Sequence, residues 1–359
     1  MKRTVFFLSM LATGLLVSSC SNDLDEGQEA AGSGKPISFN VLEHKQLRSA
    51  TTTSTINDFR LLAVDETGKT LIDGLEVTGN GAHWTYSPLG LWPETETTQV
   101  NFYAFSPAEA DGIDEGLAGQ TGPSPTIKYA LPGHSVNTSL SLSDQEDLLV
   151  THHTGTFFKE GVSGVNLNFR HALSRVLFKA KSESSHTFEV LGIALKNIKS
   201  SGKLNLASLP KDNATFDLAG SGYRIYWDTS VGTNGDLVAN LGKGVTIKGD
   251  GDYHYFIVDD TVALYVIPQE NTVSSLDKVT LVNETFIPPS GFYIEITYKE
   301  SGQSNEEAVT YAVPVPAIVG DAYKSSIAFE IERQYTFQFE LFSHGLAPVN
   351  PLTENIDKD

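Results

Sequence analysis

Histidines, a serine and several acids have the side-chain types needed for catalysis or metal binding. His152 and His153 are adjacent, but no HExxH-like spacing accompanies them, so a zinc site would need ligands from distant segments. Ser163 lacks the glycine two residues later that a nucleophile elbow requires, which favours a linker. We therefore expect solvated loop histidines, no catalytic constellation and a protein that is not an enzyme.

Acidic and glycine-rich segments are the next places where a cofactor or metal ion could bind. Asp250 and Asp252 alternate with glycines, but their spacing departs from a calcium-binding EF-hand loop, so we favour a tight acidic turn. Neither a dinucleotide-binding glycine motif nor a phosphate-binding Walker A motif occurs, and Gly242-Lys243-Gly244 is typical of a turn between strands. The sequence predicts no cofactor and no metal ion.

Aromatic side chains offer flat surfaces on which sugars can stack. Trp84, Trp92 and Trp227 are the tryptophans, with Tyr86 and Tyr226 close by in sequence. Packing in a core or at strand ends is the default interpretation. The alternative is a monomeric surface glycan-binding lipoprotein that uses Trp84 or Trp227 to hold sugar.

Composition restricts the class of protein. The 359 residues include 25 basic and 44 acidic side chains, and a net charge of −19 opposes general nucleic-acid binding. With 40% apolar and 19% charged residues, the chain has the composition of a globular protein, and its length allows two domains. We expect no nucleic-acid partner.

The single cysteine excludes an internal disulfide and a cysteine-rich zinc site, but it lies in a pattern of its own. Lys2-Arg3, the apolar run 5–17 and two serines precede Cys20, as in a secretory signal that ends at a lipobox. The run is shorter than the roughly 20 residues of a membrane-spanning helix. We predict a signal peptide at 1–19, removed to leave Cys20 as the lipidated first residue.

Residues 20–35 contain glycine, serine, alanine and acids but almost no large apolar side chain, so they cannot contribute a core element. We interpret this segment as a flexible tether. Acyl chains on Cys20 would hold the mature protein at a membrane.

After Pro36, apolar residues repeatedly alternate with other residues, as in Ile37-Phe39-Val41 and Phe292-Ile294-Ile296. This period of two predicts half-buried strands, and turn residues separate the runs. Residues 109–122 lack apolar partners and predict a long solvated loop. We expect an all-β protein with two sandwich domains, at 36–163 and 164–359.

Several segments together resemble the fimbrillins, pilus subunits and related surface proteins of Bacteroidetes. Besides the lipobox, the matching segments are Ile37-Ser38-Phe39-Asn40-Val41, Arg48-Ser49-Ala50, Phe59 to Val64, Asn101 to Pro107, Asp147 to Val150, and Val165 to Ser174. They occur in the family's order over nearly the whole chain.

The resemblance implies two tandem transthyretin-like Greek-key β-sandwich domains. It also implies a lipoprotein precursor, held at the outer-membrane surface by palmitate-type acyl chains and processed at Arg48-Ser49. Leu47 stands where the family often has threonine before the arginine. The cut would release a removable first strand containing Ile37, Phe39 and Val41.

The resemblance further implies that other fimbrial subunits, identical or different, supply a strand to the vacated groove, which is β-strand addition. The candidate donor strand alternates apolar and other residues at Tyr335, Phe337, Phe339 and Leu341. It can equally complete the second sandwich. A tail with Leu346, Val349, Leu352 and Ile356 is another candidate donor. The sequence leaves open a shaft, base or tip position in the fimbrium, and the adhesion ligand on host or bacterial surfaces.

Overall fold

The computed structural model describes most of the chain after residue 33. The described residues are 34–42, 56–80, 83–132, 145–161, 163–183, 185–211, 226–256, 263–272, 274, 276, 278–282, 286, 290–315, 317–319, 322–324 and 326–355. Cys20, Arg48, Ser49 and Ile356 lie outside this set. Within it, no helix combines the length and apolar character needed to cross a membrane.

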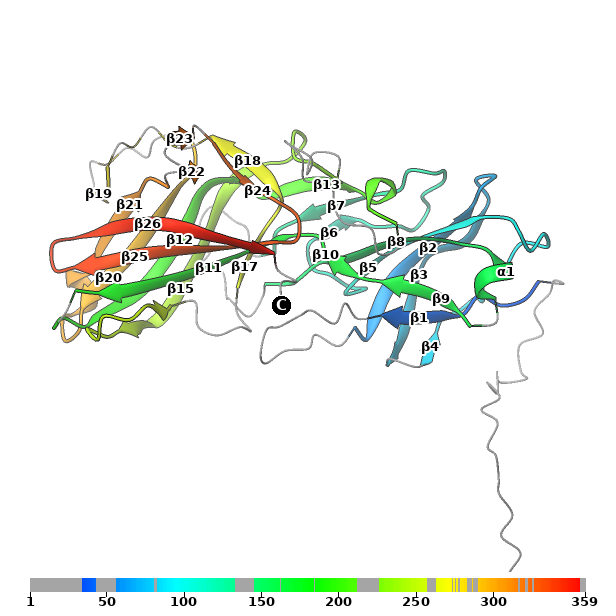
Figure 1. Ribbon diagram of the computed structural model, residues 1–359, viewed down its shortest axis with the longest axis horizontal. Coiled ribbons are helices and arrows are strands. Elements are labelled where there is room, and N and C mark those ends of the chain that lie inside the picture. Colours follow the sequence, from blue (N-terminus) through cyan, green and yellow to red (C-terminus); the bar gives the residue numbers. More distant parts are fainter. Residues whose placement is uncertain are drawn as a thin grey trace, which may run out of the picture. The chain divides into compact units, whose positions relative to one another are not determined.

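An antiparallel sheet of six strands dominates the N-terminal half (Figure 1). In spatial order its strands are β10 (Arg170–His171), β8 (Leu149–Gly155), β5 (Val100–Ser106), β2 (Asp58–Asp65), β3 (Thr70–Asn80) and β4 (His83–Thr85). β3 follows β2 through the turn at Gly68, whose φ of 88° is in the left-handed region that glycine adopts readily. We call it the N-terminal sheet.

The central strands of the N-terminal sheet, β8, β5 and β2, are buried on both faces. Along β5, Phe102 and Ala104 belong to one hydrophobic cluster, whereas Tyr103 and Phe105 belong to another. Successive side chains of a strand point to opposite faces, so each face covers a different core. This explains why the strand is a continuous apolar run and does not alternate cleanly.

Two further sets of strands cover these faces. β1 (Phe39–Leu42) and β9 (Val165–Asn168) pair in parallel, and their side chains join the cluster that contains Phe102. On the other face lie β14 (Trp227–Asp228), β13 (Ser201–Asn205), β7 (Thr126–Ala130) and β6 (Ile113–Glu115), in that spatial order. The helix α1 (Phe157–Glu160) precedes β9.

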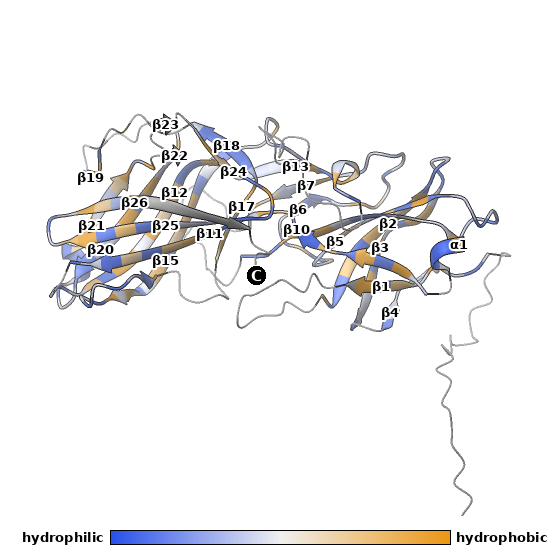
Figure 2. Ribbon diagram, viewed as in Figure 1, coloured by the Kyte–Doolittle hydropathy of each residue, from blue (hydrophilic) through white to orange (hydrophobic). Residues whose placement is uncertain are grey.

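Two five-stranded sheets make up most of the C-terminal half. One contains β16 (His254–Tyr255), β11 (Ser174–Ser182), β25 (Arg333–Phe342) and β26 (Gly345–Asn355), with β17 (Leu264–Val266) also paired to β11. The other contains β15 (Asn234–Ile247), β12 (Phe188–Lys199), β20 (Tyr293–Glu300), β21 (Val309–Val313) and β19 (Thr280–Val282). Inward side chains of both sheets share one hydrophobic cluster, and hydrophobic and hydrophilic segments are interspersed along the strands (Figure 2).

Short strand pairs and 3₁₀ turns complete the described structure. β18 (Gln269–Thr272) pairs with β24 (Ser326–Phe329), and β22 (Ala317–Val319) pairs with β23 (Ala322–Lys324). Two 3₁₀ turns are η2 (Leu206–Ser208) and η3 (Asn305–Glu307), the latter with a capping box between Ser304 and Glu307.

The all-β prediction is confirmed. The transthyretin-like topology and the division at 163 and 164 stay predictions. Pairing crosses that position, because β9 pairs with β1 and β10 with β8. The expectation of a long solvated loop at 109–122 was wrong, since the segment contains β6 and buries Leu117 beneath the N-terminal sheet.

The packing of the shared core can be tested at Trp227. Its indole Nε1 donates to the Ala172 carbonyl at 2.9 Å, and its ring packs edge-on to Tyr129. We expect Trp227→Ala to lower the free energy of unfolding by about 3–5 kcal/mol, through lost burial and a cavity. Urea denaturation measures it, with Phe158→Ala as control because Phe158 is 77% exposed. Equal midpoints for the two variants would contradict this packing.

Candidate subunit-assembly site

The first strand fills a groove in the core. Ile37 and Phe39 are only 2% and 5% exposed, and Val41 packs against the same cluster half-buried. Along β1, Phe39 is in register with Val165 and Val41 with Leu167, both fully buried. The alternation seen in the sequence therefore places three apolar side chains on the core face.

Backbone hydrogen bonds hold this segment on two sides. Ahead of β1, Ile37 N donates to Gly90 O at 3.0 Å and Trp92 N donates to Lys35 O at 2.9 Å. Further along, Val165 N donates to Ser38 O at 2.8 Å, and the parallel pairing with β9 follows. A strand in this position must pair with different neighbours at its beginning and at its end.

Phe39 lies in a cluster of aromatic rings. Its ring centroid is 6.2 Å from Phe59, 5.5 Å from Tyr86 and 6.2 Å from Phe102. The Tyr86 hydroxyl also donates to Ile37 O at 2.8 Å. Burial raises the pKa of Tyr86 to about 12, so this hydroxyl stays protonated at neutral pH and can donate. We call the surface formed by residues 90–92, β9, Phe59, Tyr86 and Phe102 the β1 groove.

Ser163 and Gly164 close one end of the β1 groove. The Asn40 side-chain amide donates to the Ser163 carbonyl, and Gly164 has a φ of 83° directly before β9. Ser163 thus belongs to a connecting turn, as the linker interpretation expects. The processing position Arg48-Ser49 follows Leu42 by six residues in the sequence and lies outside the described set.

The candidate donor strand Tyr335 to Leu341 is the central part of β25. It pairs in parallel with β11 over eight residues and antiparallel with β26. Its inward side chains are all buried: Tyr335, Phe337, Phe339 and Leu341. In this structure β25 therefore completes the chain's own core, which is the second of the two interpretations that its sequence allowed.

The tail beyond β25 folds back as β26. Among the described residues, β26 pairs only with β25, so it is an edge strand. Leu346 is buried at its start and Val349 is half-buried. Pro348 and Pro351 lack an N–H, and proline in sheets is largely restricted to edge strands and bulges.

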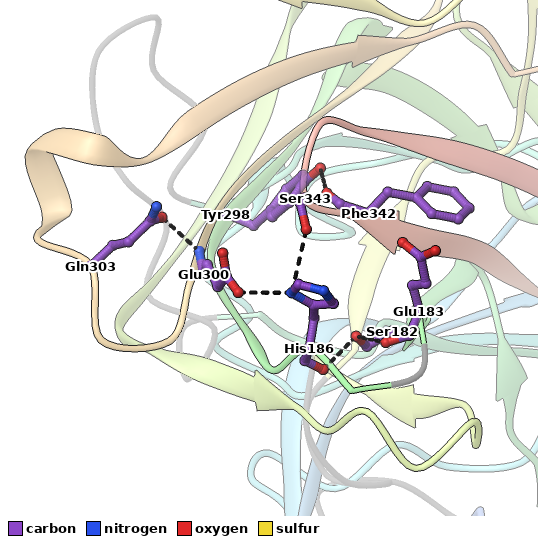
Figure 3. Close-up of polar contacts among 8 residues, drawn as sticks. All are labelled: Ser182, Glu183, His186, Tyr298, Glu300, Gln303, Phe342 and Ser343. Atoms are coloured by element: carbon purple, nitrogen blue, oxygen red, sulfur yellow. Dashed lines mark hydrogen bonds and ion pairs between the residues drawn. The ribbon is translucent and has the colours of Figure 1, made fainter.

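Polar contacts join three turns around the tip of the β25–β26 hairpin (Figure 3). The Tyr298 hydroxyl lies 2.6 Å from Gly345 O and 3.2 Å from Phe342 O, on either side of the turn. His186 Nδ1 contacts Glu300 Oε1 at 2.8 Å and Ser343 Oγ at 3.3 Å. We call His186, Tyr298, Glu300 and Ser343 the hairpin cluster.

The hairpin cluster contains a serine, a histidine and a carboxylate, but in an arrangement unlike a catalytic triad. Ser343 and Glu300 both contact Nδ1 of His186. In a triad the serine and the acid contact opposite ring nitrogens, so the histidine can relay a proton from one side to the other. These contacts hold the hairpin turn.

The expectation that His152 and His153 are solvated was wrong. They lie on β8, in a sheet buried on both faces, so both side chains are enclosed. His152 stacks on Tyr103 and contacts Leu209 O at 3.2 Å. His153 Nε2 lies 2.7 Å from Glu160 Oε1. The two histidines point to opposite faces and share no ligand site.

The tryptophans pack as the default interpretation expects. Trp92 and Trp227 are buried, and the half-buried Trp84 lies 5.1 Å from the Phe59 ring. Trp227 therefore offers no exposed face for a sugar. The acidic turn is present: Asp250 accepts from Asp252 N at 3.0 Å and contacts His254 at 2.8 Å. That contact with His254 is the main cause of a lowered pKa at Asp250.

Three residues of the family-like segments, Asp147, Arg170 and His171, take part in two close polar contacts that the sequence did not predict. Asp147 Oδ2 lies 2.6 Å from His171 Nδ1, beside the β8–β10 pairing. Arg170 donates from two nitrogens to Glu332 at 2.7 and 2.9 Å. Glu332 precedes β25 by one residue, so this pair joins the N-terminal sheet to the start of β25. Sequence spacing gives no signal for partners this distant.

Solved structures with a similar fold come from two species of Bacteroides. A fimbrial protein from Bacteroides vulgatus has a TM-score of 0.53 at 15% identity, with 90% of this chain and 99% of that chain covered. A candidate cell adhesion protein from Bacteroides ovatus has a TM-score of 0.52 at 12% identity, with 90% and 98% covered. At these identities the likeness concerns the fold.

No curated protein matches the chain. A family model described as Fimbrillin-like matches residues 48–341, which include all but the last residue of β25 and most of the sheets described above. The match begins at Arg48, directly after the segment that carries β1. With most of its length matched, the chain belongs to the fimbrillin-like family.

Proposed function

We propose that this chain is a fimbrial subunit that is exported as a lipoprotein precursor and assembled by strand exchange. Lipid on Cys20 holds the precursor at the outer-membrane surface, cleavage after Arg48 releases the segment that carries β1, and a neighbouring subunit fills the β1 groove. Family membership supports a fimbrial role. The proposal that the first strand is removable depends on how β1 packs in its groove.

The observation that carries the proposal is a buried strand that precedes the expected cleavage position. Ile37 and Phe39 fill the core from a segment that precedes Arg48. Each buried side chain of this kind contributes about 1.5–3 kcal/mol. Loss of the strand therefore leaves an apolar groove and unpaired backbone groups, which an incoming strand can satisfy.

The position of β26 favours it over β25 as the donated strand. β25 has neighbours on both sides, so its departure would break two ladders and remove four buried side chains from the core. β26 has one neighbour among the described strands, and its release leaves β25 paired with β11. The hairpin cluster holds the turn from which β26 would swing away.

Processing at Arg48 can be tested with Arg48→Ala. We expect native fimbrial material to begin at Ser49, whereas the variant retains its N-terminal segment and stays monomeric because β1 keeps occupying its groove. N-terminal sequencing and unheated gel electrophoresis of sheared surface material measure both. Arg60→Ala is the matched control. Assembly of the Arg48→Ala variant at the native rate would refute cleavage as the trigger.

Release of β26 can be tested with a reversible lock. Gln338 and Val349 are cross-strand partners of β25 and β26, so Gln338→Cys with Val349→Cys can form a disulfide between them. In protein that starts at Ser21, we expect the oxidised double variant not to polymerise after cleavage, and reductant to restore polymerisation. Val349→Cys alone is the control. Polymerisation of the oxidised form would exclude β26 as donor.

The hairpin cluster should set the rate of this release. Tyr298→Phe removes only the hydroxyl beside Phe342 O and Gly345 O, and the ring keeps its packing. A hydrogen bond of this kind contributes about 1 kcal/mol, so we expect roughly fivefold faster assembly of cleaved subunits. Light scattering follows the kinetics. Tyr311→Phe, on the neighbouring strand, should leave them unchanged, and an unaltered Tyr298→Phe rate would contradict the role.

A further inference from the structure

A polar groove in the C-terminal half lies outside the contacts assigned to strand exchange. It has a cavity volume of about 710 Å³. Its lining consists of Asn197, Lys199, Asn234, Glu270, Asn271 and Thr272, with Ser290 and Gly291. We call it the Asn271 groove. β12, β15 and β18 position most of these residues.

Asn271 is the unusual residue of the lining. Along β18, Gln269 and Asn271 are buried, whereas Glu270 and Thr272 are exposed. The side-chain amide of Gln269 is paired at both of its polar atoms. Its nitrogen donates to Lys199 O at 2.9 Å and to Ile267 O at 3.0 Å, and its oxygen accepts from Lys199 N. Asn271 is only 6% exposed, and its Nδ2 has no hydrogen-bond partner among the residues that the structure describes.

An unpaired buried amide is rare in folded proteins because it loses its water partners without replacement. An apolar side chain of the same size at position 271 would need no hydrogen-bond partner and would avoid this cost. Retention of the amide in a groove wall is explained when a ligand supplies the acceptor. The unpaired amide then lowers the stability of the free protein but supplies a contact to the ligand.

The chemistry of the lining indicates the ligand. One lysine and one glutamate balance in charge, and the remaining side chains are amides and hydroxyls that both donate and accept. None of the described lining residues is aromatic or strongly apolar, which opposes a lipid or a flat hydrophobic molecule. The volume is within the range of small-molecule sites.

We propose that the Asn271 groove binds a neutral carbohydrate, with a sugar oxygen accepting from Asn271 Nδ2 and Asn234 contacting a further hydroxyl. Among the described residues, Lys199 Nζ has a long contact of 3.4 Å to Gly232 O, so it can reach the ligand as well. Sugar hydroxyls are donors and acceptors at once, which matches this mixed lining. The inference is independent of strand exchange.

The test uses the soluble chain from Ser21 on an array of immobilised oligosaccharides built from galactose, mannose, fucose, glucose and N-acetylhexosamines, with sialylated versions beside them. We expect retention on at least one neutral oligosaccharide. Titration calorimetry with that sugar should show Asn271→Leu and Asn234→Ala each weakening Kd about tenfold. Thermal unfolding of Asn271→Leu should occur at the native temperature or above, because the unpaired amide is gone.

The matched control is Asn240→Ala, which lies on the same strand as Asn234 but lines a different cavity of about 370 Å³. It should bind the sugar with native affinity. The proposal is overturned if the native chain retains no neutral oligosaccharide, if only sialylated ones bind, or if Asn271→Leu keeps native affinity. A destabilised Asn271→Leu with unchanged binding would show a structural role.

Discussion

The core of the N-terminal half depends on the packing of β1. Ile37 and Phe39 complete a core that Phe59, Phe102 and Phe169 line from the other side. The core is closed only while some strand occupies this position. Because the pairing partners are backbone groups, the requirement concerns an alternating strand and not a unique sequence. Without a strand in this position, the apolar side chains of this core would face water.

β1 and β26 are attached in different ways. β1 lies between two neighbours and is covered by aromatic rings, whereas β26 pairs along its length with β25 alone among the described strands. β1 is thus enclosed on both sides, whereas β26 leaves one edge without a partner among the described strands.

Sequence periodicity predicted the strands but not their neighbours. Ile37-Phe39-Val41 and Tyr335 to Leu341 alternate equally well, and both are buried. Alternation could not distinguish a central strand from an edge strand, since both have one apolar face. The histidine prediction failed for a related reason. A sheet covered on both faces buries polar and apolar residues alike, and His153 is accommodated by Glu160 from the next element.

The parallel pairing of β11 with β25 joins segments far apart in the chain. Arg175 and Gln334, which are in register, are separated by 159 residues. Contacts between residues so far apart in the sequence form late in folding, because a long loop must close before these contacts can stabilise the fold. During synthesis, β11 emerges long before β25, and its edge stays without that partner at this stage. A topology that leaves a strand edge open for so long exposes the folding chain to aggregation.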